Sequence, residues 1–497
     1  MTQPTAIEID RATPTGIEGL DEILRGGLPE NRLYLLLGNP GVGKTTMALQ
    51  YLLEGARRGE VGLYIALSET REEIQSVARS HGWPIDRIAI FELSALEQQL
   101  AQEEQNTVFH PAEIELNQTT QMLLDKIQEV KPKRLVLDSL SELRLLSDSP
   151  LRYRRQMLSF KQFFAGQRMT VILLDDHSVE GGDLHVQSIA HGVITIEQVA
   201  FDYGVEKRRL RVSKMRGLNF ASGYHDATIE PGGMRVFPRR GASRVDSGPR
   251  QVMTSGINEL DHLLGGGLDG GTSCLLLGAA GTGKSTIALQ FAVNAARKGE
   301  RVLMCLFEED LERLKARAAS VGMPIDEALG SGHLEILQVN PAELTPGEFV
   351  HRVITQVEAK GSRIVVIDSV NGYMYAMPDI RFLNIQLHDL LSYLNSRGIL
   401  TILIVAQHGL VGQMHTPIDL TYLADTVLLM RFFEQGGRIK KAISVIKRRI
   451  GRHEDTLREF KIDSGGLRVG QPLEEFHGVL TGTPTFQGTS EQMIRNR

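Results

Sequence analysis

The chain contains a long internal repeat. Residues 16–70 align without a gap on residues 256–310, and 25 of the 55 paired positions are identical. The same offset of 240 residues pairs the tripeptide PID at 84–86 with PID at 324–326. This agreement indicates an internal duplication. Because the period is far longer than a solenoid unit, each copy is expected to be a whole domain.

The seam between the copies falls within residues 238–251, PRRGASRVDSGPRQ. This stretch is rich in Pro, Gly, Ser and Arg and has no apolar periodicity, which is typical of a linker. We place the boundary near residue 247. The sequence therefore predicts a first domain over residues 1–247, a second domain over 248–486 and a short C-terminal tail over 487–497.

Short apolar runs alternate with helical stretches in each copy. In the first copy, the runs at 33–38, 134–139 and 170–176 are apolar on both faces, as expected for parallel strands covered by helices on each side. The later stretches 208–217 and 440–451 alternate more and are expected to add amphipathic strands. The predicted fold class is α/β, with two tandem domains that each have a mainly parallel sheet flanked by helices.

Each copy contains a phosphate-binding loop of the form G-x-x-x-x-G-K-[ST]. In such a loop the glycines let backbone N–H groups converge on phosphate oxygens, and the following helix adds the positive end of its dipole. The lysine neutralises the β- and γ-phosphates, and the hydroxyl after it binds magnesium. The predicted nucleotide-binding residues are Gly38, Gly41, Gly43, Lys44, Thr45 and Thr46 in the first copy and Gly278, Gly281, Thr282, Gly283, Lys284, Ser285 and Thr286 in the second.

Magnesium in such a site also needs a carboxylate at the end of a neighbouring strand. Asp138 and Asp368 each end an apolar run and precede a serine. Together with the loop hydroxyls of Thr45 and Ser285, they are the predicted metal ligands. The alternative is that each aspartate caps its own strand end or the next helix.

Hydrolysis requires a further carboxylate that orients or deprotonates water. Glu69 and Glu309 occupy equal positions in the repeat, preceded by Ser68 in one copy and by Glu308 in the other. We predict Glu69, Glu308 and Glu309 as the catalytic carboxylates, with a spare base in the second copy. The alternative is that the glutamate opens the following helix as part of a capping box.

Composition narrows the classes of function. The 497 residues carry 55 Lys and Arg against 60 Asp and Glu, a net charge of −5, so no overall positive field draws the chain to nucleic acid or to an anionic membrane. Two cysteines, Cys274 and Cys305, exclude a disulfide framework and a cysteine-built zinc site and fit a reducing compartment. Without a secretion signal or an apolar run of about 18 residues, we expect a cytoplasmic protein that does not cross a membrane.

The chain resembles the KaiC family of tandem RecA-like ATPases over nearly its whole length. Besides the tandem loops, the most specific matches are LFEED at 306–310, KMRG at 214–217, TPIDLTYLADTVLLMRFFE at 416–434 and LREFKIDSGGLRV at 457–469. The resemblance implies two RecA-like P-loop domains, ATP hydrolysis and a role in circadian-type timing or signalling. It also implies a two-tiered homohexamer that holds ATP and Mg²⁺ between adjacent subunits.

The resemblance assigns roles to two pairs of basic residues. Lys214 and Arg216 in the first domain, and Lys447 and Arg449 in the second, would reach the γ-phosphate held by a neighbouring subunit. A cation supplied in this way stabilises the charge that develops during phosphoryl transfer. The alternative is a solvated strand face.

The family's second domain also phosphorylates itself on hydroxyls just before a strand that begins Asp-Thr. The matching positions here are Thr421, Tyr422 and Thr416, so the resemblance implies a Ser/Thr autokinase with Thr421 as the main acceptor. Tyr422 departs from the family pattern, because its ring carries the hydroxyl several ångströms further from the backbone. The alternative is that these residues merely lead into the strand.

The resemblance also suggests protein partners, and alternative functions stay open beside it. It implies a KaiB-like or other signalling protein as partner, whereas the short tail makes an activator that binds through the tail less expected. Two other functions stay open: a RadA- or DnaB-like DNA-associated motor, with residues 205–216 as its basic surface, and a scaffold whose ATP is structural. The acidic balance of the chain disfavours nucleic acid.

Overall fold

A computed structural model gives the fold of the chain. It describes residues 11–93, 111–147, 149–176, 184–199, 206–239, 251–375, 380–409, 419–435, 437–479 and 485–486. The chain divides into two compact units, Met1–Arg239 and Arg240–Arg497. The domain boundary predicted near residue 247 and the predicted tail 487–497 lie outside the described residues.

The first unit is built on a sheet that has nine strands in the described residues. In chain order these are β3 (Leu33–Leu37), β4 (Gly62–Ala66), β5 (Ile88–Glu92), β6 (Arg134–Asp138), β7 (Thr170–Asp175), β8 (Gly192–Val199), β9 (Lys207–Met215), β10 (Tyr224–Glu230) and β11 (Gly233–Phe237). The helices are α1 (Leu20–Ile23), α2 (Lys44–Arg57), α3 (Arg71–Ser80), α5 (Pro111–Val130), α6 (Leu140–Leu145), α7 (Pro150–Gly166) and α8 (Leu184–Ile189). A separate antiparallel pair consists of β1 (Ala12–Thr13) and β2 (Leu28–Pro29).

The second unit repeats this plan within its described residues. Its main strands are β14 (Ser273–Ala279), β15 (Val302–Leu306), β16 (Leu334–Gln338), β17 (Ile364–Asp368), β18 (Leu400–Gln407), β19 (Thr426–Gln435), β20 (Arg438–Arg448), β21 (Arg458–Asp463) and β22 (Gly466–Pro472). Its helices are α9 (Asn258–Leu263), α10 (Lys284–Arg297), α11 (Leu311–Ser320), α12 (Ile325–Gly330), α13 (Pro346–Lys360), α14 (Val370–Tyr375) and α15 (Ile380–Ser396). Two short pairs are β12 (Val252–Met253) with β13 (Leu268–Asp269) and β23 (Phe476–His477) with β24 (Thr485–Phe486).

Strand order is the same in both sheets. The first runs β5-β4-β6-β7-β3-β8-β9-β10-β11 and the second β16-β15-β17-β18-β14-β19-β20-β21-β22. Pairs from β5 to β8 and from β16 to β19 are parallel, and the remaining pairs are antiparallel. Each unit is therefore a RecA-like α/β domain. The predicted mainly parallel sheets and the added amphipathic strands after them are confirmed.

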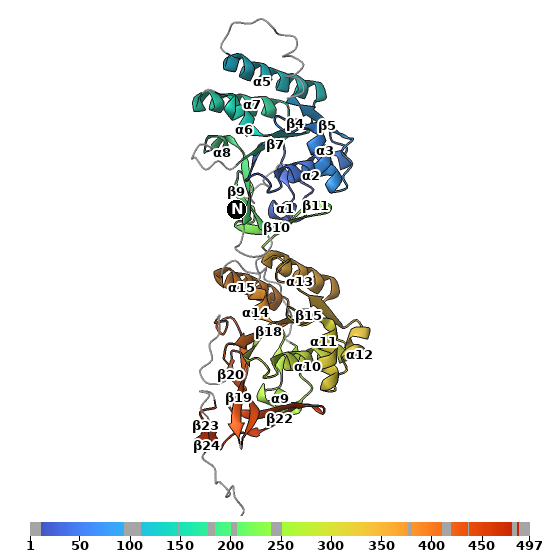
Figure 1. Ribbon diagram of the computed structural model, residues 1–497, viewed down its shortest axis with the longest axis vertical. Helices are drawn as coiled ribbons and strands as arrows, with labels where there is room; N and C mark the ends of the chain where they lie inside the picture. The colour runs from blue at the N-terminus through green and yellow to red at the C-terminus, as the bar shows by residue number, and fades with distance from the viewer. Residues whose placement is uncertain are drawn as a thin grey trace, which may run out of the picture. The chain divides into compact units, whose positions relative to one another are not determined.

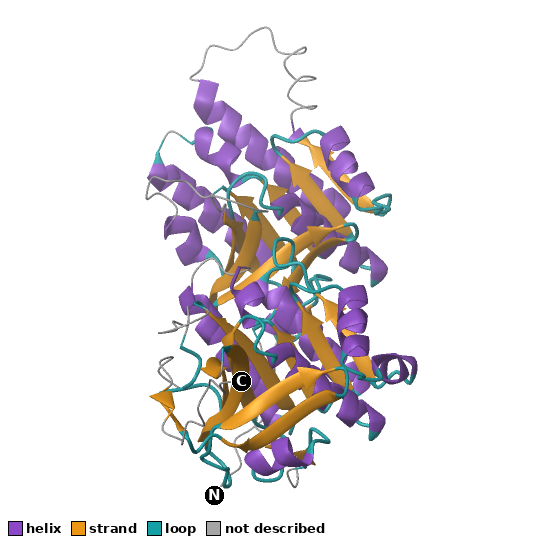
Figure 2. Ribbon diagram, turned by 60° about the horizontal axis from the view of Figure 1, so that its bottom comes forward, coloured by secondary structure: helices purple, strands orange, loops and turns teal. Residues whose placement is uncertain are grey.

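Helices cover both faces of each sheet (Figures 1 and 2). On β3, Tyr34 and Leu36 face a core that includes Ile74 of α3, whereas Leu35 and Leu37 face a core shared with α5, α6 and α7. Every residue of β3, β4, β6 and β7 is buried. A strand buried on both faces needs apolar side chains along its length, which is why the middle of each of these segments is apolar, while the buried polar residues of β6 and β7 stand at the strand ends.

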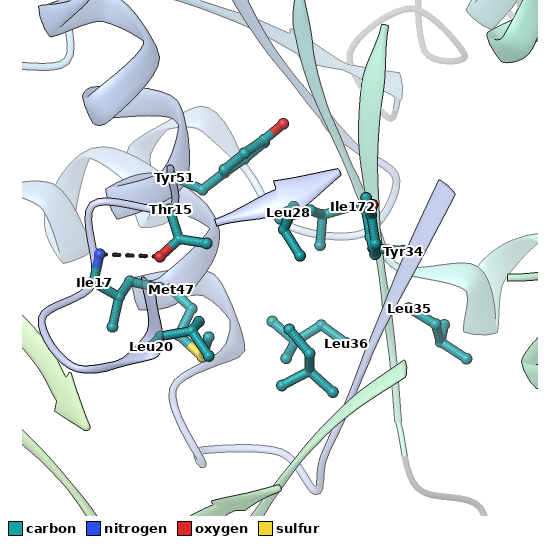
Figure 3. A pocket seen from close by; sticks show the side chains of 11 residues that line it. Thr15, Ile17, Leu20, Leu28, Tyr34, Leu35, Leu36, Met47, Tyr51 and Ile172 are labelled. Carbon is teal, nitrogen blue, oxygen red and sulfur yellow. Dashed lines mark hydrogen bonds between the residues drawn. The ribbon is translucent and has the colours of Figure 1, made fainter. Parts of the chain in front are cut away.

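A small gap lies in the core of the first unit beside β3 (Figure 3). Its volume is about 10 Å³, and its lining includes Leu20, Leu28, Leu36, Met47 and Ile172. A cavity holds a water molecule only when it reaches about 10–15 Å³ and offers polar partners. Because the lining is almost wholly apolar, we interpret this gap as a packing defect of the core and not as a functional site.

Candidate nucleotide-binding sites

The two phosphate loops connect the carboxyl end of a central strand to a helix. Gly43 and Gly283 occupy the residue before α2 and α10, with φ of 105° and 107°. This left-handed region favours glycine. A Cβ at Gly43 would overlap Ile229 of β10, and one at Gly283 would overlap Ile462 of β21. Glycine is therefore required for the loop conformation, and it also leaves room for the tip of an isoleucine side chain from the antiparallel strands.

The helices that follow the loops begin with a turn of backbone N–H groups. In the described residues, no side chain caps the N-terminus of α2 or of α10. The first N–H groups of a helix have no partner within the helix and, with the helix dipole, favour an anion. Both loops thus have the donor set that a phosphate group requires.

The loop lysines lie along these same loops. Lys44 Nζ donates to the carbonyl oxygens of Gly38 at 2.7 Å and Asn39 at 3.1 Å, and it pairs with Asp176 Oδ1 at 2.8 Å. Lys284 Nζ donates to the carbonyls of Gly278 and Ala279 at 2.9 and 2.7 Å.

The surroundings of Lys284 change its pKa. Burial lowers the pKa of Lys284 to about 8, although the nearby Asp368 carboxylate acts in the opposite direction. A buried ammonium that has only carbonyl partners is stabilised when an anion reaches it.

Each unit brings its predicted metal ligands together. Asp138 accepts a hydrogen bond from Thr45, and Asp368 accepts one from Ser285. Asp138 also accepts a hydrogen bond from the hydroxyl of Tyr64. Burial raises the pKa of Asp138, and it raises the pKa of Asp368 to about 6 despite the hydrogen bond from Ser285.

These contacts place the aspartates at the loops and not at a helix end. Ser139, not Asp138, occupies the N-cap of α6. In both units a hydroxyl and a carboxylate, the oxygen ligands that magnesium prefers, lie side by side at the end of the sheet.

Glu69 lies beside the first loop. Its Oε1 is 3.5 Å from Thr45 Oγ1, and burial, together with the charges of Asp138 and Glu73, raises the pKa of Glu69 to about 7. The capping box of α3 consists of Thr70 and Glu73. Glu69 therefore has no part in that capping box, which was the alternative to a catalytic role.

The second unit separates its two glutamates. Glu308 accepts hydrogen bonds from Ser369 Oγ at 2.7 Å and Ser369 N at 3.2 Å, directly after Asp368. Glu309 makes a bidentate ion pair with Arg317, at 2.6 and 3.0 Å. The residue 240 positions before Arg317 is Val77. The arginine therefore distinguishes the second site from the first.

An acidic pair beside the first loop was not predicted from the sequence. Asp175 is fully buried and pairs with Arg144 at 2.5 Å, while Asp176 pairs with Lys44. Ser141 Oγ lies 3.3 Å from a carboxylate oxygen of each. The signal was present in the sequence, because residues 173–176 at the end of β7 read LLDD where the corresponding residues 403–406 of β18 read LIVA.

The predicted trans-acting cations bind main-chain carbonyls of their own unit. Lys214 donates to the carbonyls of Gln187, Ser188 and Ala190, and Arg216 also donates to Ser188. In the second unit the same pattern recurs at the residues before β19: Lys447 donates to the carbonyls of Thr421 and Ala424, and Arg449 to that of Tyr422. These side chains therefore do more than cover a solvated strand face.

The predicted phosphoacceptors lie in that same segment before β19. Thr421 Oγ1 donates to Asp419 Oδ1 at 2.6 Å, and the Thr421 backbone N–H donates to the same oxygen at 2.9 Å. These bonds lower the pKa of Asp419. Tyr422 is exposed. Thr416 lies outside the described residues.

The basic stretch considered for DNA is engaged within its own sheet. Arg209 pairs with Glu197 at 2.6 Å. The guanidinium groups of Arg209 and Arg211 lie 4.1 and 5.1 Å from the ring centre of Tyr224. In the described part of this stretch, these side chains are therefore used to join β8, β9 and β10.

Fold and loops define a tandem P-loop nucleoside triphosphatase with two RecA-like domains. The family model described as "ATPase: KaiC" matches residues 13–241 and again residues 253–474. The chain therefore belongs to the KaiC family of ATPases, and the predicted resemblance is confirmed. An ATPase family of this kind binds ATP.

Curated proteins of this family are similar to the chain over nearly its full length. The circadian clock protein KaiC3 of Synechocystis sp. is 28% identical, covering 96% of this chain and 95% of the relative. The circadian clock oscillator protein KaiC of Thermosynechococcus vestitus is 27% identical, with 99% and 95% covered. That of Parathermosynechococcus lividus is 25% identical, with 96% and 89% covered.

The helices also bear on membrane insertion. In the described residues, none combines the length and the apolar character that crossing a bilayer requires.

Proposed function

We propose that both units bind ATP with Mg²⁺ and hydrolyse it. The observation that carries this proposal is that each unit joins a loop lysine, an uncapped helix N-terminus and a strand-end aspartate hydrogen-bonded to the loop hydroxyl. Magnesium, when bound, neutralises charge on the β- and γ-phosphates. Thr45 with Asp138, and Ser285 with Asp368, would hold it.

The chain's own residues divide the remaining work. Lys44 and Lys284 hold the phosphates, and the backbone N–H groups of the loops orient them. Glu69 in the first unit and Glu308 in the second would accept the proton of the attacking water. Because Arg317 neutralises Glu309, this glutamate is expected to orient its neighbours and not to act as the main base.

Phosphate release from ATP tests this proposal. With magnesium we expect steady turnover, which a chelator abolishes and which the double variant Lys44→Ala/Lys284→Ala loses. The double variant Lys131→Arg/Lys360→Arg, altered at lysines outside the loops, should keep full activity. Bound ATP that is never hydrolysed would instead indicate a scaffold with structural nucleotide.

We further propose a homohexamer with nucleotide between adjacent subunits, acting in the cytoplasm in circadian-type timing or signalling with a KaiB-like or other protein partner. The names of the curated relatives support the timing role. The equal register of Lys214 against Val193 and of Lys447 against Val427 supports one assembly mode for both units. With saturating ATP and magnesium, light scattering should give the mass of six chains. The mass of a monomer would contradict the proposal that the basic residues at the ends of β9 and β20 reach a neighbouring subunit's γ-phosphate.

We also propose a Ser/Thr autokinase in the second unit, with Thr421 as acceptor. The Thr421 hydroxyl donates to the carboxylate of Asp419, which holds its oxygen in place, and Glu308 would accept its proton. Intact mass and peptide mapping after incubation with ATP should place one phosphate on Thr421. Thr421→Ala and Glu308→Gln should abolish it, whereas Tyr422→Phe should not. Phosphate on Tyr422 alone, or none at all, would contradict this proposal.

A further inference from the structure

The two loop lysines differ in one contact. Lys44 Nζ, on a side chain that is 10% exposed, pairs with Asp176 Oδ1 at 2.8 Å, and the Asp176 side chain is 43% exposed. The strand register identifies the residue of the second unit that corresponds to Asp176. Leu37 pairs with Asp175 in the first sheet, and Leu277 pairs with Val405 at the same place in the second. The residue equivalent to Asp176 is therefore Ala406, which offers no carboxylate.

The residues around Asp176 differ between the units as a group. In the first unit, Ser141 contacts both aspartates and Arg144 pairs with Asp175. The residues 230 positions later are Asn371 and Met374. Asn371 bonds to the backbone of Ala406 through its amide, at 2.7 and 3.2 Å. A charged network at the end of β7 is thus replaced by a neutral one at the end of β18.

Asp176 and a γ-phosphate compete for the same ammonium group. The loop lysine of a P-loop site reaches the β- and γ-phosphates. With a diphosphate, Lys44 can keep its ion pair with Asp176 while it serves the β-phosphate. With a triphosphate, the γ-phosphate takes the lysine and brings negative charge towards the freed carboxylate, and like charges at short range disfavour binding.

On the proposed function of ATP binding in both units, we propose that Asp176 is a specificity-determining residue that shifts the first site towards ADP relative to the second. The effect is a difference of affinities between two ligands, produced by a repulsive element directed at one of them. Ala406 places no such charge beside Lys284. The first unit would therefore hold ADP under conditions in which the second holds ATP.

Competition binding measures this preference. In the full chain carrying Lys284→Ala, nucleotide binding reports on the first unit only. A fluorescent ADP analogue is bound there and then displaced by ATP or by ADP in magnesium buffer. We expect Asp176→Asn to raise the ratio of ATP affinity to ADP affinity by about tenfold, as for loss of one partly exposed charge repulsion. The matched control is Asp86→Asn, an exposed carboxylate between α3 and β5, which should leave the ratio unchanged.

A reverse variant keeps the test sharp if the first one folds poorly. Ala406→Asp in a chain carrying Lys44→Ala should lower the ratio at the second site by a similar factor. If Asp176→Asn bound both nucleotides normally and left the ratio of ATP affinity to ADP affinity unchanged, the inference about Asp176 would be overturned, while the proposed function would stand. Failure of the first site to bind either nucleotide, with or without Asp176→Asn, would overturn the proposed function itself.

Discussion

The two phosphate sites share their backbone and differ in their side chains. Gly41 and Gly281 have φ of 82° and 79°, as close as the pair Gly43 and Gly283. Around this common backbone, the first site pairs its loop lysine with Asp176 and gives its strand-end aspartate a hydrogen bond from Tyr64. In the second unit, the residue that corresponds to Tyr64 is Met304, which has no hydroxyl. The second site instead has an arginine on one of its two glutamates.

This difference indicates which parts of such a site tolerate change. Backbone donors depend on glycines and on the sheet, so duplication preserved them. The side chains at the strand ends are exchanged as a set, with Arg144 and Asp175 of the first unit corresponding to Met374 and Val405 of the second, so they have diverged. We infer that the two units share a binding mode and differ in electrostatics.

The largest effect is expected from the loop lysines. Lys44→Ala should weaken nucleotide binding in the first unit by about 100-fold and Lys284→Ala in the second, because each removes a charge-assisted contact from a buried position. Equilibrium dialysis with labelled ATP measures this loss. The exposed Lys133→Ala is the control. If either single loop variant emptied both units, the sites would not be independent.

The next comparison concerns the glutamates. Glu308→Gln should slow hydrolysis in the second unit by about 100-fold, as for loss of a general base. Glu309→Gln should slow it less, because Glu309 is tied to Arg317. Phosphate release in a Lys44→Ala chain reads the second unit alone. Equal losses in the two variants would contradict the division of roles.

A smaller effect tests the charged network at the end of β7. Arg144→Met, which copies Met374, should lower the free energy of unfolding of the first unit by about 2 kcal/mol, because it removes the cation from the buried Asp175. The double variant Arg144→Met/Asp175→Val copies the second unit and should recover most of this loss. Chemical denaturation of the unsubstituted chain, of Arg144→Met, of Asp175→Val and of the double variant gives the coupling energy between the two residues. If the losses in free energy of unfolding of the two single variants simply added up in the double variant, the ion pair would not be the cause.

The smallest effect concerns the loop against α9. Glu454 N–H donates to the Leu263 carbonyl, as Ala221 N–H donates to that of Ile23 in the first unit. Hydrogen bonds from Arg458 are the main cause that lowers the pKa of Glu454 from 4.5 to about 2. A lowered carboxyl pKa stabilises the fold above the unfolded value of 4.5 and stops doing so as the pH falls towards 2.

Glu454→Gln should therefore lower the melting temperature of the second unit by about 3 °C near neutral pH. The difference from the unsubstituted chain should shrink as the pH falls below 4.5. Calorimetry at a series of pH values measures this, with the first unit's transition as internal reference. A difference that stayed constant down to pH 2 would show that the ion pair is not its cause.

The sequence predicted the fold and the loops because both are encoded locally. Apolar runs, glycines and the G-x-x-x-x-G-K-[ST] pattern lie within short segments, and the repeat doubles their weight. The contact of Asp176 with Lys44 joins residues that are 132 positions apart in the sequence. It depends on β7 lying beside β3 and was therefore missed. The pairing of Arg317 with Glu309 was missed as well, because a helical arginine is usually solvated.

Nucleotide content per chain tests the central claim, that each unit holds its own nucleotide. The full chain is saturated with ATP and magnesium, freed of unbound ligand on a desalting column and denatured, and the released ATP and ADP are counted by chromatography against protein concentration. We expect two nucleotides per chain. One nucleotide per chain at saturation would contradict it, because one of two loops with the same backbone would then be unable to bind.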